Sequence, residues 1–135
     1  MHKINKYEHR GTWKYIYIMP LDLGLKESFL TQCKAYIEAF YLGSIVKFSK
    51  PVSLEKDTEI QRRKNCGHVQ YNAMDFINKY KNKVPADAYC MIAITLNDIY
   101  PGEKWNFVFG MASLNERVGL FSLARYDPRY FDPEL

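Results

Sequence analysis

The stretch from Tyr89 to Leu96, which reads Tyr-Cys-Met-Ile-Ala-Ile-Thr-Leu, is almost continuously apolar. A strand with one face in water alternates apolar and polar side chains, whereas a strand covered on both faces is apolar throughout. We therefore expect this stretch to form the central strand of a sheet. The sequence Tyr100-Pro101-Gly102 predicts a turn shortly after it.

A strand–helix–strand unit is predicted upstream of this strand. Residues Trp13 to Met19 are mostly β-branched or aromatic and predict a first strand, which Pro20 closes. From Leu25 to Leu42 apolar side chains recur every three to four residues, which predicts an amphipathic helix with Gly43 as its left-handed cap. Ser44 to Phe48 predict a second strand, and the spacing of the three segments is typical of a right-handed βαβ crossover.

Between this unit and the central strand we expect a loop and a second helix. Leu54 to Gly67 are mostly polar, with no apolar face, and predict a long surface loop. A helix stopped by Pro85 is then predicted from apolar residues at helical spacing, namely Val69, Ala73, Phe76, Ile77 and Tyr80.

Two further strands are predicted after the central one. Trp105 to Ala112 alternate in size and polarity, and Val118 to Arg125 form the last strand. The order β-α-β-α-β-β-β predicts an α/β fold, with a mixed twisted sheet of about five strands and two main helices. We expect one folded unit from residue 12 to residue 135, preceded by a flexible tail over residues 1–11.

Composition restricts the class of protein. The 135 residues are 47% hydrophobic and 16% aromatic, which excludes a disordered chain. No apolar run approaches the ~18–20 residues of a membrane span, so no membrane partner is expected. The formal net charge is only +4, and the run Arg62-Arg63-Lys64 has no aromatic platform beside it. We interpret that run as solvated surface and expect no nucleic-acid partner, with a basic nucleic-acid binder as the weakest alternative.

The cysteines give no sign of a disulfide framework or a zinc ribbon. Cys33, Cys66 and Cys90 are odd in number and far apart, and no C-x-x-C pair exists. We interpret Cys33 and Cys90 as small core residues. A reducing compartment, the cytoplasm or the nucleus, fits this pattern.

The residues with catalytic potential do not form a recognised motif. The chain has three histidines and no H-E-x-x-H pair, so no helix can present two imidazoles to one metal. Cys66-Gly67-His68 is more simply a loop coincidence than a nucleophile–base dyad, and no G-x-S-x-G elbow exists. Asp98 follows the central strand, where ligands gather in open α/β sheets, but a turn or cap role is the commoner one. We therefore predict neither catalytic nor metal-binding residues.

Gly110 and Ala112 leave little side-chain bulk on one face of the predicted strand from Trp105 to Ala112. Glycine within a strand often marks the close approach of another backbone. An extended peptide could pair with this strand at a sheet edge, or a helix could pack tightly against it. The pattern alone favours the packed helix.

Three blocks of the C-terminal half resemble the archaemetzincins. They are Thr95-Leu96-Asn97-Asp98-Ile99-Tyr100-Pro101, Asn106-Phe107-Val108-Phe109-Gly110-Met111-Ala112-Ser113 and Val118-Gly119-Leu120-Phe121-Ser122-Leu123-Ala124-Arg125-Tyr126. The blocks share the order and similar spacing of that family, and weaker similarity extends the resemblance to roughly residues 13 to 126.

The resemblance implies a family of zinc-dependent metallopeptidases, with aminopeptidase-like hydrolysis of peptides and the upper half of a metzincin-like domain as the fold. It also implies that the strand before the last one is the edge strand above the substrate cleft, formed here by Phe107, Val108, Phe109, Gly110, Met111 and Ala112. The family's zinc helix, H-E-x-x-H-x-x-G-x-x-H, has no counterpart before Leu135. We therefore expect the N-terminal sheet portion of such a domain, truncated before that helix, which binds no zinc and does not catalyse by itself.

The lack of the zinc helix leaves two alternatives. The chain could act as a non-catalytic peptide-binding or regulatory module that uses the same edge strand. It could also self-associate, because a sheet without its lower half exposes apolar surface.

Overall fold

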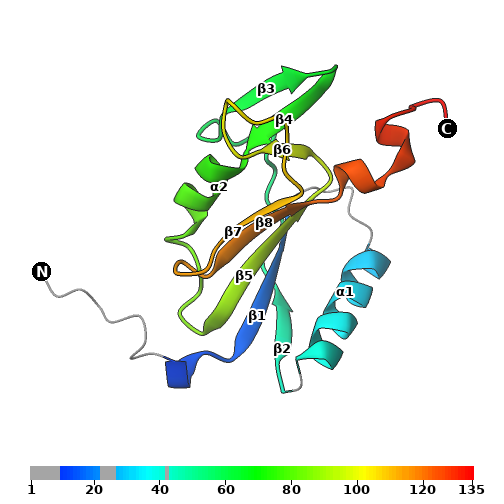
Figure 1. The fold of residues 1–135 in the computed structure, drawn as a ribbon. Helices are drawn as coiled ribbons and strands as arrows, with labels where there is room; N and C mark the ends of the chain where they lie inside the picture. Colours follow the sequence, from blue (N-terminus) through cyan, green and yellow to red (C-terminus); the bar gives the residue numbers. More distant parts are fainter. Residues whose placement is uncertain (1–9, 22–26, 42) are drawn as a thin grey trace, which may run out of the picture.

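The computed structural model describes residues 10–21, 27–41 and 43–135 of the chain (Figure 1). The strands are β1 Tyr15–Pro20, β2 Ile45–Phe48, β3 Arg62–Asn65, β4 His68–Asn72, β5 Ala88–Thr95, β6 Asp98–Tyr100, β7 Gly110–Ser113 and β8 Val118–Ser122. The helices are α1 Glu27–Phe40 and α2 Ala73–Tyr80, with 3-10 turns η1 Arg10–Thr12, η2 Ala124–Tyr126 and η3 Pro128–Tyr130. Residues 1–9 of the predicted tail lie outside the described part.

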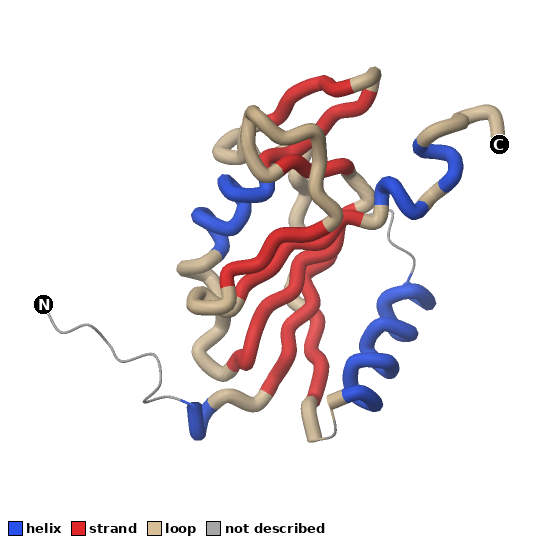
Figure 2. The backbone as a smooth tube through the Cα atoms, viewed as in Figure 1, coloured by secondary structure: helices blue, strands red, loops and turns tan. Residues whose placement is uncertain are grey.

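A five-stranded mixed sheet of order β2-β1-β5-β8-β7 forms the centre of the fold (Figure 2). The predicted central strand is confirmed, because β5 pairs in parallel with β1 on one side and with β8 on the other. Only β7 runs antiparallel to its neighbour. The predicted α/β class, five-stranded mixed sheet and two helices are therefore confirmed.

The predicted strand–helix–strand unit is also confirmed. β1 and β2 pair in parallel, with Ile16 opposite Val46, and α1 connects them. Gly43 adopts φ +88° after the helix, where an L side chain would be strained. The ends of the predicted helix, Leu25 and Leu42, lie outside the described residues.

Each face of the large sheet packs against one helix (Figure 1). On one face, Phe76 and Ile77 of α2 join Met91, Ala93 and Leu120 of the sheet in a buried cluster. On the other face, α1 covers a second cluster, formed by Ile16, Ile18, Val46 and Ile94. Fully burying a side chain such as Phe76 or Ile77 stabilises a fold by about 1.5–3 kcal/mol, which holds α2 in place. Helix α1 packs through Leu30, Cys33 and Ile37, which are only partly buried.

The predicted surface loop from Leu54 to Gly67 is wrong. Leu54 and Ile60 are both buried in the α2-side core, and Arg62–Asn65 form β3. β3 pairs antiparallel with β4, which pairs in parallel with β6, so a second sheet of order β3-β4-β6 lies beside the large one. Cys66 and Gly67 both have positive φ in the two-residue hairpin turn, as a type I′ turn requires.

The second helix is shorter than predicted. It begins at Ala73, because Asn72 is an N-cap whose side chain accepts a 3.0 Å hydrogen bond from the backbone N–H of Asp75. Val69 lies on β4 instead. The predicted strand from Trp105 to Ala112 is likewise reduced to β7, while Val108 makes a single bridge to Ile99 of β6.

None of the helices in the described ranges is both long and apolar enough to cross a bilayer.

Candidate functional site

The free edge of β7 is the first part of the candidate site. β7 pairs with β8 on one side only and ends the five-stranded order. The backbone carbonyl of Phe109 accepts a 2.8 Å hydrogen bond from the N–H of Ser122. Directly opposite residues of antiparallel strands alternate between hydrogen-bonded and non-hydrogen-bonded pairs. The backbone N–H and C=O groups of Met111 and Ser113, like those of Phe109, therefore point toward β8. Gly110 and Ala112 therefore direct their N–H and C=O groups away from the sheet.

Glycine is needed at position 110 because an aromatic ring, and not a helix, lies close to its backbone. A Cβ at this position would overlap Cδ1 of Phe121, the residue directly across the pair. Gly119 on β8 lies under the same ring, because a Cβ there would meet Cε2 of Phe121 at 2.9 Å. The tight approach predicted at Gly110 is real, but its partner is the Phe121 side chain on the α1 face, and α2 packs on the opposite face.

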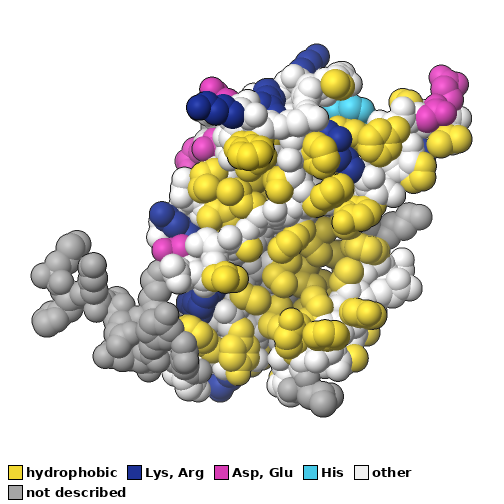
Figure 3. Space-filling model, in the orientation of Figure 1, with side chains coloured by type: hydrophobic (Ala, Val, Ile, Leu, Met, Phe, Trp, Pro, Cys, Tyr) yellow, Lys and Arg dark blue, Asp and Glu magenta, His cyan; other side chains and the backbone are white. Residues whose placement is uncertain are grey.

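The α1 face of the sheet is only partly covered. Helix α1 lies over β2 and β1, and Phe121 on β8 remains 40% exposed. Phe109 and Tyr126 pack on each other with ring centroids 5.3 Å apart and are themselves 47% and 68% exposed. Figure 3 shows hydrophobic side chains gathered in one area over the sheet and α1. Several large apolar side chains on this face are therefore in contact with water.

The second part of the site surrounds the buried carboxylate of Asp98. We call it the Asp98 cluster, and it also contains Gln70, Arg125 and Tyr130. The guanidinium of Arg125 binds both carboxylate oxygens of Asp98, with Nε–Oδ1 at 3.1 Å and Nη2–Oδ2 at 2.9 Å. Gln70 and Tyr130 each donate a 2.8 Å hydrogen bond to Oδ2. Asp98 is 2% exposed, so these bonds replace the water that it loses on burial.

The electrostatics of the cluster keep Asp98 ionised. Burial alone would raise the pKa of Asp98, but hydrogen bonds from Arg125, Gln70 and Tyr130 outweigh burial and hold the pKa below its usual value. Burial, together with the hydrogen bond to Asp98, raises the pKa of Tyr130 to about 12. The cluster therefore contains a fixed ion pair and a neutral phenol, with no group poised to exchange a proton near neutral pH.

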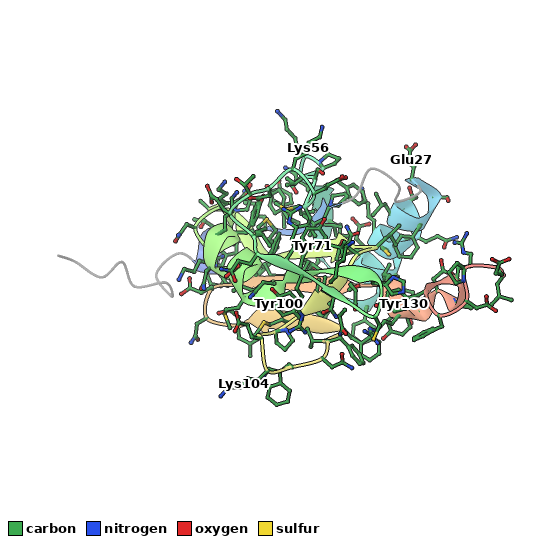
Figure 4. The ribbon with its side chains drawn as sticks, turned by 90° about the horizontal axis from the view of Figure 1, so that it is seen from above. Glu27, Lys56, Tyr71, Tyr100, Lys104 and Tyr130 are labelled. Carbon is green, nitrogen blue, oxygen red and sulfur yellow. The ribbon has the colours of Figure 1, made fainter. Side chains whose placement is uncertain are left out.

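The Asp98 cluster fastens the segment after β8 to the small sheet. The ring of Tyr130 stacks on His68 of β4 with centroids 3.8 Å apart, and Figure 4 shows Tyr130 where the C-terminal segment meets that sheet. The guanidinium carbon of Arg125 lies 3.6 Å from the ring centroid of Phe107. The path of the chain beyond β8 is therefore set by contacts to three distant elements.

Arg63 organises the loop that leads to β7, a role that the sequence analysis missed. Its Nε donates to Gln70 Oε1 at 2.8 Å, and its Nη1 donates to the backbone carbonyl of Glu103 at 3.0 Å. Its Nη2 donates to the carbonyls of Trp105 and Asn106. Arg62 binds three loop carbonyls. The predicted solvated run therefore also holds neighbouring loops, although Arg62 and Lys64 are exposed.

The six predicted edge-strand residues divide into two groups. Gly110, Met111 and Ala112 lie on β7, whereas Phe107, Val108 and Phe109 precede it in irregular backbone. The N–H of Val108 donates to the carbonyl of Ile99, so β6 already occupies the edge at that point. The free edge is therefore shorter than the predicted one.

The described residues do not fit a catalytic zinc ion. Among them, no group of three or more His, Cys, Asp or Glu side chains lies close enough together to hold a metal. His68 is stacked on Tyr130, and the Asp98 carboxylate is occupied by three neighbouring side chains. Cys66 is exposed in the hairpin turn, and His68 lies on β4.

The chain is similar to curated archaemetzincins. It is 38% identical to archaemetzincin-2 of Rattus norvegicus over 122 residues, which are 86% of this chain and 34% of the rat protein. It is 36% identical to archaemetzincin-2 of Homo sapiens over 108 residues, and 32% identical to human archaemetzincin-1 over 121 residues. These matches cover 79% and 87% of this chain, but 30% and 24% of the human proteins. The chain thus spans about a third or less of the length of these relatives.

A solved structure matches the fold. The crystal structure of an archaemetzincin from Methanopyrus kandleri superposes with a TM-score of 0.61 and 26% sequence identity, covering 93% of this chain and 65% of that one. No family model matches the sequence.

Proposed function

Because this chain is a homologue of the archaemetzincins over most of its length, we propose that it is the sheet portion of a zinc-metallopeptidase domain and forms the upper wall of its substrate cleft. In this proposal the peptide substrate lies extended along β7. The protein contributes to peptide-bond hydrolysis, of the aminopeptidase kind ascribed to the family, by holding the substrate backbone.

One observation carries this proposal. Gly110 and Ala112 direct their backbone N–H and C=O groups away from β8 at the free end of the five-stranded sheet. An extended peptide can bind such an edge through main-chain hydrogen bonds that do not depend on its sequence. β7 contains neither a charged residue nor a proline, the features that proteins commonly use to block edge pairing.

We further propose that this stretch of 135 residues does not hold zinc or hydrolyse peptides by itself. The absence of a ligand cluster from its described residues supports this, because a metallopeptidase needs the metal to activate water and polarise the scissile carbonyl. Titration with zinc in a calorimeter should reveal no stoichiometric tight site. A tight site with a ratio of one would contradict the proposal.

The substitution Ala112→Pro tests edge binding directly. It removes an N–H that points outward, so it leaves the β7–β8 ladder intact. Binding of a fluorescein-labelled, threonine- and valine-rich heptapeptide should weaken at least fivefold in A112P, while the unfolding transition of the protein changes little. The matched control is Lys50→Pro, in an exposed residue after β2 on the other side of the sheet, which should leave binding unchanged. Equal binding by A112P and the unaltered chain would overturn the proposal.

A second candidate function is a non-catalytic peptide-binding or regulatory module that uses the same edge. The lack of a zinc ligand group in the described ranges favours it. The coding sequence distinguishes the two candidates. A reading frame that continues into H-E-x-x-H supports the sheet portion of a peptidase. A protein that is made in the cell and ends at Leu135 supports the non-catalytic module.

Two further properties belong to this proposal. We propose self-association through the uncovered α1 face, supported by the 40% exposure of Phe121. We also propose a reducing compartment, the cytoplasm or the nucleus, supported by the three free thiols of Cys33, Cys66 and Cys90.

A further inference from the structure

A groove runs beside the free edge of β7, on the side of the sheet that α2 covers. Its volume is about 390 Å³, and its lining comes from α2 and the residue after it, from β7 and from the turn after β7. The lining residues that matter for binding are Met74, Ile77, Lys81, Met111 and Glu116. The groove therefore borders the same strand whose outward backbone groups carry the proposed function.

Strand geometry directs side chains of an added peptide into this groove. Successive side chains of a strand point to opposite faces of the sheet. Met111 belongs to the α2 face, where it packs against the buried cluster, and Phe121 lies on the other face. In a peptide paired with β7, every second side chain would thus meet the groove, and the others would meet the uncovered α1 face.

The floor of the groove suits an apolar side chain. Met74 on α2 is 41% exposed, and Met111 is partly buried against the core. Methionine is unbranched and adapts its shape to different apolar neighbours. Ile77 is buried beneath them and makes the floor continuous with the core. An aliphatic or aromatic side chain entering here would cover methionine surface that is now in water.

The polar end of the groove carries one available cation. No ion pair within the described ranges involves Lys81, which follows the last residue of α2. Glu116 also lines the groove, but it already interacts with another group. The groove therefore has an apolar floor and, in Lys81, an ammonium group without an ion pair among the described residues. This combination suits an apolar side chain accompanied by a carboxylate.

We propose that the groove between α2 and β7 selects an extended peptide segment with an apolar side chain and, two residues away on the same face, an acidic side chain. This inference rests on the proposed function, because the peptide backbone must pair with β7 to place those side chains. The backbone pairing supplies general peptide binding, and the groove supplies the preference among sequences.

The test compares two peptides on two proteins. The probes are acetylated, amidated heptapeptides rich in threonine, with leucine at the centre and, two positions later, either glutamate or lysine. Affinity is measured by fluorescence anisotropy, and the binding position by shifts of the Gly110 and Ala112 amide signals in the ¹⁵N-labelled chain. The glutamate peptide should bind the unaltered chain about threefold to fivefold more tightly than the lysine peptide, as expected for a partly exposed ion pair.

The variant Lys81→Glu should reverse that preference, and Lys81→Gln should abolish it. Lys50→Glu is the matched control, because it makes the same charge change beyond β2, on the other side of the sheet, and should leave the preference unaltered. If both peptides bind every variant with equal affinity while the Gly110 and Ala112 signals still shift, the proposed selectivity of the groove is wrong. Binding of peptide backbone to the β7 edge would still stand. No shift with either peptide would overturn the proposed function and, with it, this inference.

Discussion

The phenolic hydroxyl of Tyr130 donates a 2.8 Å hydrogen bond to Oδ2 of Asp98, across 32 residues of sequence. The same carboxylate receives both the Arg125 guanidinium and the Gln70 amide. A single buried charge on β6 therefore joins β4, β6 and the two 3-10 turns after β8. This arrangement explains why the chain after the last strand turns back onto the small sheet.

The first prediction concerns the charge of Asp98. Asp98→Asn leaves the Arg125 guanidinium without its partner, and the free energy of unfolding should fall by about 3 kcal/mol at pH 7. Urea denaturation followed by circular dichroism measures this change. The control is Asp132→Asn, an exposed residue whose substitution should change the free energy by less than about 0.5 kcal/mol.

The same variant has a defined pH dependence. The pKa of Asp98 is lowered in the folded protein, from a value of about 3.9 in unfolded chains. The stability that this carboxylate contributes is therefore complete above about pH 5 and is lost as pH falls through the folded pKa. The difference between the unaltered chain and D98N should shrink in acid. A difference that stays constant down to the acid transition would contradict the assignment.

A second prediction concerns Tyr130. Tyr130→Phe removes the hydrogen bond to a buried charge and should lower the free energy of unfolding by about 2 kcal/mol at pH 7. The pKa of Tyr130 is raised to about 12, so this contribution is complete below about pH 10 and declines as pH rises toward 12. Unfolding curves of the two proteins should therefore converge over that interval. Parallel curves up to pH 12 would show that the phenol is not bound to Asp98.

A third prediction concerns the ring over Gly110. Gly110→Ala places a methyl group against Phe121 and should lower the free energy of unfolding by about 1–3 kcal/mol, the usual cost of overpacking. The matched control is Gly102→Ala, where the nearest atom is 3.9 Å from the new Cβ. Adding Phe121→Ala to G110A removes the clash, so the two substitutions should combine non-additively. Simple additivity would rule out the contact.

A fourth prediction concerns the uncovered α1 face. Phe121→Gln replaces a half-exposed ring with a polar side chain of smaller area, and should lower self-association at least fivefold in sedimentation velocity. Leu114→Gln is the control, since Leu114 is 89% exposed in the turn after β7. A monodisperse monomer with a concentration-independent melting temperature in the unaltered chain would refute self-association altogether.

The large sheet could be predicted because its strands carry their own signals. β5 is apolar on both faces, and β1 and β2 are separated by a helix followed by Gly43 at positive φ. The small sheet could not be found in this way. β3 consists of Arg62–Asn65, four polar residues whose strand conformation depends on pairing with β4. Val69 and Ala73 keep helical spacing across the strand–helix boundary, so the pattern predicts helix where the structure has β4.

One local signal at that boundary was overlooked. Asn72 followed three residues later by Asp75 is a typical helix N-cap pattern and would have placed the start of α2 correctly. The Asp98 cluster has no such local signal, since its members are brought together only by the tertiary fold. At the candidate edge, the sequence could predict a close contact at Gly110. It could not predict that Phe121 makes this contact, or that Val108 pairs with Ile99 of β6.

The most direct test of edge binding is amide hydrogen exchange along β7 with and without a saturating threonine-rich peptide. The structure predicts an alternating result: the amides of Gly110 and Ala112 gain protection when the peptide pairs with the edge, while that of Met111, which already faces β8, changes little. Uniform protection along the strand, or protection confined to the α1 face, would contradict the claim that substrate backbone binds at β7.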